Sequence, residues 1–342
     1  MPLRDPIQRV APRSADLDDV VFWRERTVLD SVAVAVHRVL AAGARVGVVA
    51  LAASVVAGEF ALTLLAAVEE PVVGLYVLLS VVPAFGLAAF VWRSDATRRQ
   101  PLGALVVTFL LGFAFAGFAA VLNSTFEPFF GSSFGGLVLF FFLVVGPVEE
   151  TVKWAAVRLY AYRRSAFDAV VDGAVYGAAA GLGFATIENT LYISGKYLAV
   201  ARLSGPALEL SLQTAAVRTL AGPGHVIYSA FAGYYLGLAK FNARDRGPIA
   251  VKGLLVAVFI HAAYNSVVSV MPAVVDVELL PPASQVGLGV AFLGFILVYD
   301  GLFGYALYRK LAAYRDAYLR TGADAAEARE EMPPVGREDF DP

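Results

Sequence analysis

Two adjacent acids and a lysine lie inside a long apolar stretch, where charged side chains are unusual. Glu149, Glu150 and Lys153 occur in the segment GPVEETVKW, which directly follows the apolar run LVLFFFLVV. In a helix with about 3.6 residues per turn, Lys153 projects about 40° from Glu149 and about 60° from Glu150, so the three side chains share one broad face. An ionised group costs roughly 3 kcal/mol inside a bilayer, and such residues usually line an interior cavity and carry function.

Two interpretations of this group are open. The three residues either tie helices together as a structural ion pair or take part in a reaction. Two acids against one base leave a carboxylate without an obvious partner, which favours a reaction. Pro147 has no N–H, so we expect it to free the carbonyl of Leu143 and to kink the helix just before the acids. A kink beside carboxylates makes room for water.

A third acid, Glu188, shares a helix face with two glycines in another apolar segment. In DGAVYGAAAGLGFATIENTLY, Gly177, Gly181, Phe184 and Glu188 lie within about 40° of one another on a helix. Glycines at this spacing let another helix approach closely, and the same face then presents Glu188. The alternative is that Glu188, near the outer end of its segment, reaches the lipid headgroups.

The chain has three histidines, and two of them lie in apolar segments. His225 follows AGPG, and the Gly-Pro-Gly stretch at 222–224 should break or loosen the start of its helix. His261 occurs in VFIHAAYNSV, with Asn265 four residues later and hence on the same face. A lone histidine in a membrane is more often a hydrogen-bonded link between helices than a catalyst. Two histidines, each on a face of small residues, favour a shared site.

The composition is that of a membrane protein. Of 342 residues, 58% are hydrophobic and 16% are charged, and the mean hydropathy is +0.67, whereas a soluble domain carries roughly a quarter charged residues. The absence of cysteine excludes disulfides, thiolate metal sites and a thiol nucleophile. The first thirty residues are polar and charged, so we expect no cleavable signal peptide. The net charge of -2 gives no indication of a nucleic-acid partner.

Eight stretches are long enough to cross a bilayer core of roughly 30 Å, which takes about 20 helical residues. We place these spans near residues 46–68, 71–92, 101–122, 137–158, 170–193, 218–240, 249–271 and 286–308. Connections rich in Arg and Lys alternate with connections that contain neither, apart from the fifth-to-sixth connection. Because basic residues favour the cytoplasmic side, we expect both termini there. The predicted fold is an all-α polytopic integral membrane bundle with about eight transmembrane helices.

Three parts of the chain lie outside these spans. Residues 31–45 have the pattern of an interfacial helix with a basic edge. Residues 196–217 have the pattern of an amphipathic outer loop that could act as a lid. The acidic end of the chain has the composition of a disordered tail. We therefore divide the chain into three parts. Residues 1–45 form a cytoplasmic N-terminal segment, residues 46–310 form a transmembrane domain whose motif-bearing core is 137–270, and residues 311–342 form an acidic cytoplasmic tail.

Four short motifs follow one another on four consecutive spans. EETVK ends at Lys153, FATIE ends at Glu188, His225 stands alone, and HAAYN ends at Asn265. In this order they resemble the motif series of PrsW-type intramembrane proteases, within the wider superfamily of CAAX prenyl endopeptidases and bacteriocin-processing membrane proteins. The CAAX-type pattern would have Arg where Trp154 stands and His where Glu188 stands, so the PrsW branch fits better.

The resemblance implies a multi-pass endopeptidase in the cell membrane that cuts membrane-associated protein or peptide substrates. In the best-known role of the family, the target is a single-span anti-sigma factor cut at its outer side. Peptide hydrolysis needs a base for water, donors for the oxyanion and an acid for the leaving amine. On this basis we expect Glu149 to be the general base, with Glu150 and Lys153 as the pair that positions it.

The remaining motif residues complete the site in one of two ways. In a metal-free version, Glu188 and His225 help to polarise the water, while His261 and Asn265 donate hydrogen bonds to the oxyanion. In a metal version, His225, His261 and Glu188 bind one zinc or other divalent ion, a usual catalytic ligand set, and Glu149 remains the base. The sequence has no H-E-x-x-H motif, and both versions stay open.

Two other classes of protein compete with a protease. A proton-coupled transporter could use the buried Glu, His and Lys residues as a relay, but the chain shows no internal repeat of the kind that many transporters have. A non-catalytic scaffold is the second alternative. Other intramembrane charges are expected to link helices, and among them Arg218 lies near the outer mouth, where it could hold a substrate carboxylate. The sequence does not indicate an oligomeric state.

Overall fold

The computed structural model describes residue 25 and residues 27–97, 99–278 and 285–330, and every regular element within these residues is helical. The α-helices are α2 (Val28–Glu69), α3 (Pro71–Ser80), α4 (Val82–Arg93), α5 (Leu102–Phe126), α6 (Phe134–Phe140), α7 (Gly146–Leu159), α8 (Val170–Ala201), α9 (Ala207–Phe241), α10 (Arg246–Glu278) and α11 (Gln285–Glu330). Short turns of other helical types are η1 (Glu127–Phe129), η2 (Phe141–Val145) and η3 (Ala161–Arg163). The prediction of an all-α fold is confirmed.

The chain forms two compact units, residues 1–54 and residues 55–342. Most of the described residues in the first unit belong to α2, from Val28 to Ser54. The same helix continues to Glu69 in the second unit. Residues 31–45 are thus helical, but their helix does not end before the predicted first span. Their position at the membrane surface remains a prediction.

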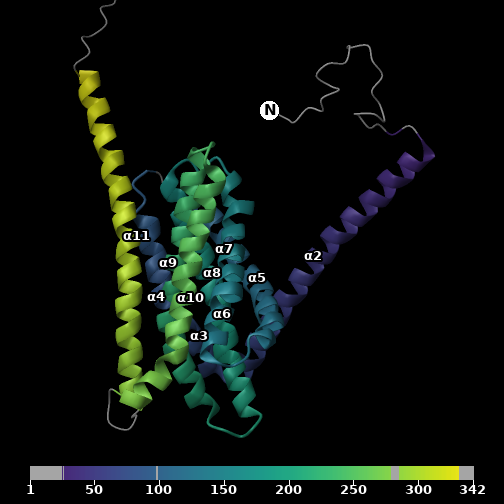
Figure 1. Cartoon of the computed structure of the whole chain (residues 1–342), viewed down its shortest axis with the longest axis vertical. Coiled ribbons are helices and arrows are strands. Elements are labelled where there is room, and N and C mark those ends of the chain that lie inside the picture. The colour runs from purple at the N-terminus through teal and green to yellow at the C-terminus, as the bar shows by residue number, and fades with distance from the viewer. Residues whose placement is uncertain (1–24, 26, 98, 279–284, 331–342) are drawn as a thin grey trace, which may run out of the picture. The chain divides into compact units, whose positions relative to one another are not determined.

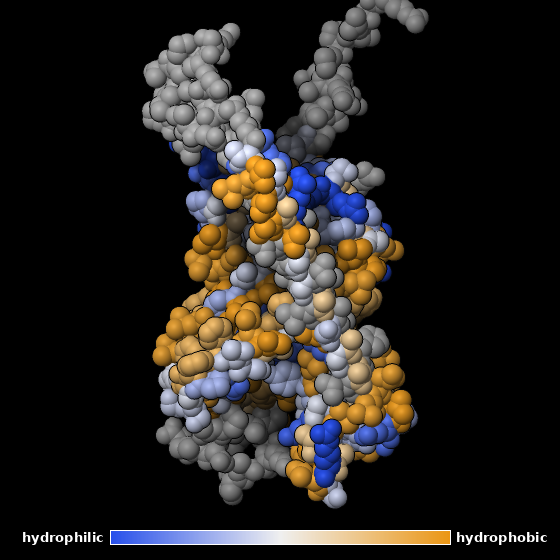
Figure 2. Space-filling model, turned by 90° about the vertical axis from the view of Figure 1, so that its right-hand side faces the viewer, coloured by the Kyte–Doolittle hydropathy of each residue, from blue (hydrophilic) through white to orange (hydrophobic). Residues whose placement is uncertain are grey.

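Within the described residues, six segments are long and apolar enough to cross a membrane. They are Pro71–Arg93, Leu102–Phe129, Phe134–Arg163, Val170–Ala201, Arg246–Met271 and Val290–Thr321. Apolar side chains cover much of the face in Figure 2, and Leu255 and Val298 are 63% and 73% exposed, as suits contact with lipid. The protein is an integral multi-pass membrane protein. The predicted spans on α2 and α9 are not among the six, so the count of eight and the cytoplasmic termini remain predictions.

Helix α8 packs against α9 and α5, and in Figure 1 it runs beside α9 inside the bundle. Gly173, Gly177 and Gly181 face the carbonyl groups of Gly233, Ser229 and His225 on α9, in that order. On another side, Gly183 faces Phe109 of α5. A Cβ at any of these glycines would overlap a carbonyl oxygen, so the close helix approach expected from the glycine face is confirmed.

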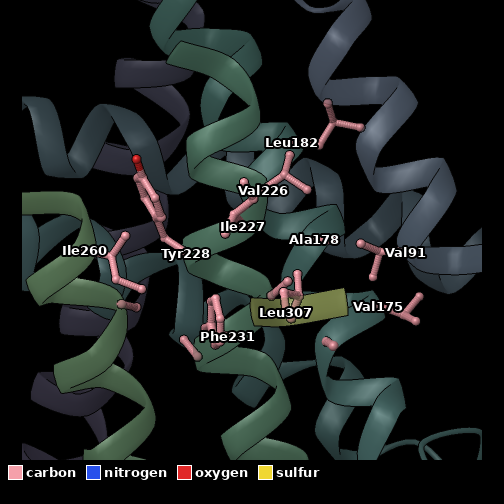
Figure 3. Packing of buried hydrophobic residues seen from close by; sticks show 14 of the residues in the cluster. Val91, Val175, Ala178, Leu182, Val226, Ile227, Tyr228, Phe231, Ile260 and Leu307 are labelled. Carbon is pink, nitrogen blue, oxygen red and sulfur yellow. The ribbon is translucent and has the colours of Figure 1, made fainter. Parts of the chain in front are cut away.

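Apolar side chains hold α9 against its neighbours (Figure 3). The cluster includes Val175, Ala178 and Leu182 of α8, Val226, Ile227 and Phe231 of α9, Val91 of α4, Ile260 of α10 and Leu307 of α11. His225 directly precedes two of these core residues on α9. The packing of α9 therefore fixes the height of the His225 imidazole within the bundle.

Two segments expected to be irregular are helical. Residues 196–201 complete α8 and residues 207–217 begin α9, so the predicted outer loop at 196–217 is wrong and the connection shrinks to 202–206. Ala, Leu, Glu and Gln dominate the segment ALELSLQ, and these are good helix formers. The predicted tail at 311–342 is wrong for residues 311–330, which continue α11, and the rest of that prediction lies outside the described residues.

The two prolines near the predicted site differ in their effect. Helix α9 continues through Pro223, so the break predicted at 222–224 is wrong. A proline is tolerated in a transmembrane helix where neighbouring groups satisfy the freed backbone carbonyl. Next to Pro147 the expected disturbance is present, because the π-helical turn η2 ends directly before α7 begins at Gly146. Such π turns are frequent at functional sites.

Candidate active site

The acid pair and the lysine lie on the first turns of α7, directly after η2. Glu149, Glu150 and Lys153 are 5%, 0% and 1% exposed. The Lys153 Nζ atom lies 2.8 Å from Glu150 Oε1 and 3.6 Å from Glu149 Oε2, so the three side chains share one face as expected. One ammonium group faces two carboxylates, and its closer contact is with Glu150.

His261 on α10 lies between the same two acids. Its Nδ1 atom is 2.8 Å from Glu150 Oε1, and its Nε2 atom is 3.7 Å from Glu149 Oε2. Because a carboxylate can only accept, we assign the proton to Nδ1, which donates to Glu150. The Nε2 lone pair then faces Glu149 across a gap too long for a direct hydrogen bond.

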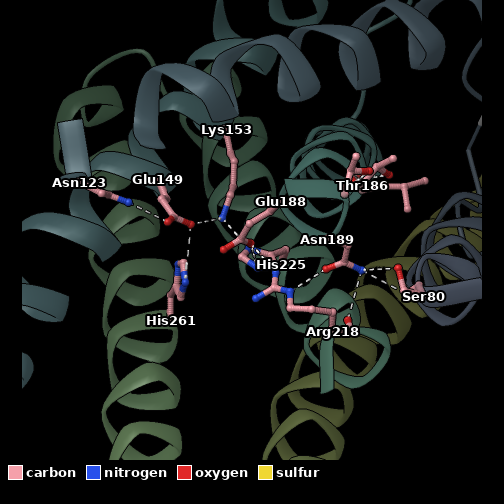
Figure 4. A network of polar contacts seen from close by, with 12 residues as sticks. Ser80, Asn123, Glu149, Lys153, Thr186, Glu188, Asn189, Arg218, His225 and His261 are labelled. Carbon is pink, nitrogen blue, oxygen red and sulfur yellow. Dashed lines mark hydrogen bonds and ion pairs between the residues drawn. The ribbon is translucent and has the colours of Figure 1, made fainter. Parts of the chain in front are cut away.

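His225 on α9 is held at both ring nitrogens (Figure 4). Its Nε2 atom is 2.8 Å from Glu188 Oε2, and its Nδ1 atom is 2.9 Å from Lys153 Nζ. An ammonium can only donate, so Nδ1 accepts from Lys153 and Nε2–H donates to Glu188. The rings of His225 and His261 meet edge to face with their centroids 5.2 Å apart.

Glu188 is tied to a further chain of contacts that crosses three helices (Figure 4). Its Oε2 atom also accepts from Arg218 Nη2 at 2.6 Å, which links α8 to α9. Arg218 Nε donates to Asn189 Oδ1 at 2.8 Å, and Asn189 Nδ2 donates to the backbone oxygen and the Oγ of Ser80 on α3. The expectation that Arg218 links helices is therefore confirmed, and its partner is an acid of the predicted site.

A cavity of about 730 Å³ adjoins this group of residues. Its wall includes Glu149, Glu188 and Asn265 of the predicted site, together with Arg218. The other four predicted residues are absent from the described part of the wall: Glu150, Lys153, His225 and His261. A molecule in the cavity therefore meets the carboxylates of Glu149 and Glu188 before it meets the imidazoles.

Glu149, His225 and His261 have the donor chemistry of a metal site. Each offers one ligand atom, and these atoms lie within 4.8 Å of one another. Two imidazoles and a carboxylate are a usual catalytic zinc set, and the buried Glu149 Oε2 has no hydrogen-bond partner among the described residues. The residues thus fit a divalent ion in donor type. The group differs from the predicted His225, His261 and Glu188 set, because Glu188 is already bound by Arg218 and His225.

Two contacts of the site are missing from the sequence-based prediction. Asn123 of α5 donates from Nδ2 to Glu149 Oε1 at 3.0 Å, and the ring of Tyr228 stacks on that of His261 with centroids 5.3 Å apart. Tyr228 follows His225 by three residues, so a shared helix face is the signal for it. Nothing in the segment VLNSTF marks Asn123.

A family model and several known proteins match more than half of the chain. A family model described as PrsW family intramembrane metalloprotease matches residues 100–299. A protein named Protease PrsW from Halalkalibacterium halodurans is 31% identical over 191 residues, which is 55% of this chain and 80% of that protein. Proteins of the same name from Bacillus subtilis and Clostridioides difficile are both 28% identical, over 56% of this chain and 81% and 79% of their own lengths. No solved structure matches the chain.

Proposed function

The chain belongs to the PrsW family of intramembrane metalloproteases, and from this we propose that it hydrolyses a peptide bond of a membrane protein with Glu149 as the general base. The observation that carries the proposal is the buried Glu149 Oε2, which has no hydrogen-bond partner among the described residues while its side chain lines the cavity. A general base needs a free oxygen within reach of the attacking water. Glu149 is the member of the acid pair at the cavity wall.

The partner acid, Glu150, is engaged in positioning contacts. Its Oε1 atom accepts from Lys153 Nζ and from His261 Nδ1, each at 2.8 Å. These contacts hold the ammonium of Lys153 close to Glu149 and turn Nε2 of His261 toward Glu149. In the proposed reaction, Glu150 and Lys153 are therefore positioning residues.

In the proposed reaction, Glu149 takes up one proton from water and later gives it to the leaving amine. Glu149 removes a proton from water, the hydroxide adds to the scissile carbonyl carbon, and the carbon–nitrogen bond then breaks. Glu149 returns the proton to the leaving amine, so the proton count balances.

Donors for the oxyanion come from the cavity wall. Asn265 and Arg218 both line the cavity and carry N–H groups suited to a developing negative charge. His261 is less suited to the oxyanion contact that the sequence suggested, because its Nδ1 proton is directed at Glu150. His225 and Glu188 would act indirectly, by fixing the positions of Lys153 and Arg218.

The family description also includes a metal. A divalent ion held by Glu149, His225 and His261 would supply Lewis-acid polarisation of the carbonyl and an activated water. Glu149 would then serve as a ligand, and Glu188 would remain the carboxylate at the cavity wall that Arg218 and His225 hold.

We expect the substrate to be a membrane protein, because the family acts within the membrane. A single-span protein cut near its outer side, like an anti-sigma factor, is the specific form of this proposal that the motif resemblance suggests. Family membership does not favour the alternative of a proton-coupled transporter.

The test compares the membrane proteomes of cells with active protein and with Glu149→Gln. The variant keeps the size of the side chain and removes the base, so we expect cleavage to fall by about 10²- to 10⁴-fold. Truncated single-span proteins should accumulate only with the active protein. The Glu149→Gln protein should show a melting temperature close to that of the wild type, since an amide still accepts from Asn123.

Glu209→Gln is the matched control, because Glu209 is an exposed acid at the start of α9 that is not part of the described cavity wall. Cleavage should continue in this variant. Unchanged truncation products in folded Glu149→Gln would refute the proposal.

A further inference from the structure

Lys153 lies in the middle of the candidate metal ligands Glu149, His225 and His261, and not at their edge. Its Nζ atom lies 2.8 Å from Glu150 Oε1, 2.9 Å from His225 Nδ1 and 3.6 Å from Glu149 Oε2. It also lies 4.0 Å from the centre of the Phe184 ring, in a cation–π contact. The lysine side chain is 0% exposed. Two of the three candidate metal ligands therefore already face one buried ammonium.

The lone pair of His225 is committed to that ammonium. A neutral imidazole carries one N–H and one lone pair. Nε2 faces the Glu188 carboxylate at 2.8 Å and so carries the proton, which leaves the lone pair on Nδ1, 2.9 Å from Lys153. Binding a metal through Nε2 instead would require Glu188 to move, and Arg218 also holds Glu188 at 2.6 Å.

A metal and the ammonium cannot share this lone pair. A zinc ion would lie about 2.0–2.1 Å from the nitrogen along the same direction, which places it almost on top of Lys153 Nζ. Two cations at such a distance repel strongly in a buried site. Metal binding by His225 and the contact between His225 and Lys153 therefore exclude each other.

We propose that Lys153 is the resident cation of the Glu149, His225 and His261 group, and that this group binds a divalent metal tightly only when the lysine is removed. The inference deepens the proposed function, because it concerns the same site. It assigns to the chain's own ammonium the task of holding an imidazole and two carboxylates together.

The experiment measures zinc binding by purified protein in lipid nanodiscs after treatment with a chelator. The informative variant is Glu150→Gln/Lys153→Met, which removes the closer ion pair as a whole and nearly keeps the side-chain volumes, so neither Glu150 nor Lys153 is left without its partner. Glu150→Gln alone retains the ammonium and is the matched control. Direct titration with zinc and metal analysis of the washed protein give the affinity and the stoichiometry.

We expect the double variant to bind one zinc ion at least about 10-fold more tightly than the wild type and the control, in line with the cost of crowding a second cation into the site. Adding His225→Ala to the double variant should remove the gain. A folded double variant without a gain in affinity would overturn the proposal. So would a wild type that retains one zinc after the chelator step.

A second measurement covers the case in which the double variant does not fold. In the wild-type background, His225→Ala should leave the zinc affinity unchanged, whereas a resident metal site predicts a large loss. The readouts also separate this inference from the proposed function. If cleavage survives Glu149→Gln, the function fails while the zinc data still decide the role of Lys153.

Discussion

Glu188 differs from the other acids of the site because one of its oxygen atoms serves two donors on the same helix. Its Oε2 atom accepts from Arg218 Nη2 at 2.6 Å and from His225 Nε2 at 2.8 Å. The contact with His225 fixes the tautomer of the imidazole and so directs its lone pair to Lys153. Partners of this kind, which orient a histidine in a reactive group, often matter nearly as much as the groups that they orient.

Replacement of Glu188 by glutamine should therefore reduce activity without unfolding the protein. The amide keeps an acceptor for one donor but loses the charge that Arg218 and His225 share, and we expect a loss of about 10- to 100-fold in cleavage rate. Cleavage of a reconstituted substrate and the melting temperature are the measurements. A rate equal to that of the wild type would mean that Glu188 does not orient His225.

The residues of the site could be predicted from sequence better than their contacts. Helical spacing correctly placed Glu149, Glu150 and Lys153 on one face, and the glycine face correctly indicated that Glu188 would be carried close to another helix. The metal ligand set could not be settled in this way, because the choice between Glu149 and Glu188 depends on Arg218 reaching across from α9. Contacts between helices far apart in sequence leave no local signal.

The glycines of α8 set its distance to α9. Gly177 faces the Ser229 carbonyl so closely that a Cβ would overlap it, whereas Gly195 on the same helix has no atom within 4 Å of an added Cβ. The two positions therefore provide a test on one helix with one type of substitution.

Gly177→Ala should destabilise the protein by about 1–3 kcal/mol, because the added methyl group forces α9 away from α8. Cleavage should fall as well, since α9 carries His225 and Arg218. Gly195→Ala should be neutral or stabilising by up to about 1 kcal/mol, because alanine favours a helix. Thermal melting in detergent measures both effects. Equal melting temperatures for the two variants would contradict the close approach.

Helix positions followed from the apolar stretches, but helix ends did not. Residues 207–217 are amphipathic, and amphipathic character alone cannot distinguish a surface loop from an extra helical length beyond the lipid. Pro223 raises the related difficulty: a proline breaks a helix in water, whereas in a packed bundle its missing hydrogen bond is tolerated. Tertiary packing decides both cases, and a local stretch of sequence does not show which helices will pack against it.

The charges of two connecting segments predict the orientation of the protein in the membrane. The segment between α5 and α6 contains no Lys or Arg, whereas the segment between α7 and α8 contains Arg163 and Arg164. The span at 134–163 separates these two segments. The positive-inside tendency therefore predicts that they lie on opposite sides, with the basic one in the cytoplasm.

A cysteine-labelling experiment tests this orientation directly, because the natural chain contains no cysteine. Ser132 and Ser165 are exposed residues of the two segments. In intact cells, a membrane-impermeant maleimide should label Ser132→Cys and should label Ser165→Cys only after the membrane is opened. Labelling of both variants in intact cells would show that the orientation or the span between them is wrong.

The π turn at Phe141–Val145 has a consequence for the wall of the cavity. A π turn contains one residue more than an α turn. Its conversion to α geometry would therefore rotate α6 about its axis by about 100° relative to α7. The cavity-lining residues Leu137 and Phe140 would rotate with α6, while Glu149 would keep its position on α7. Such a conversion would change the position of two residues of the cavity wall and leave the acid pair on α7 in place.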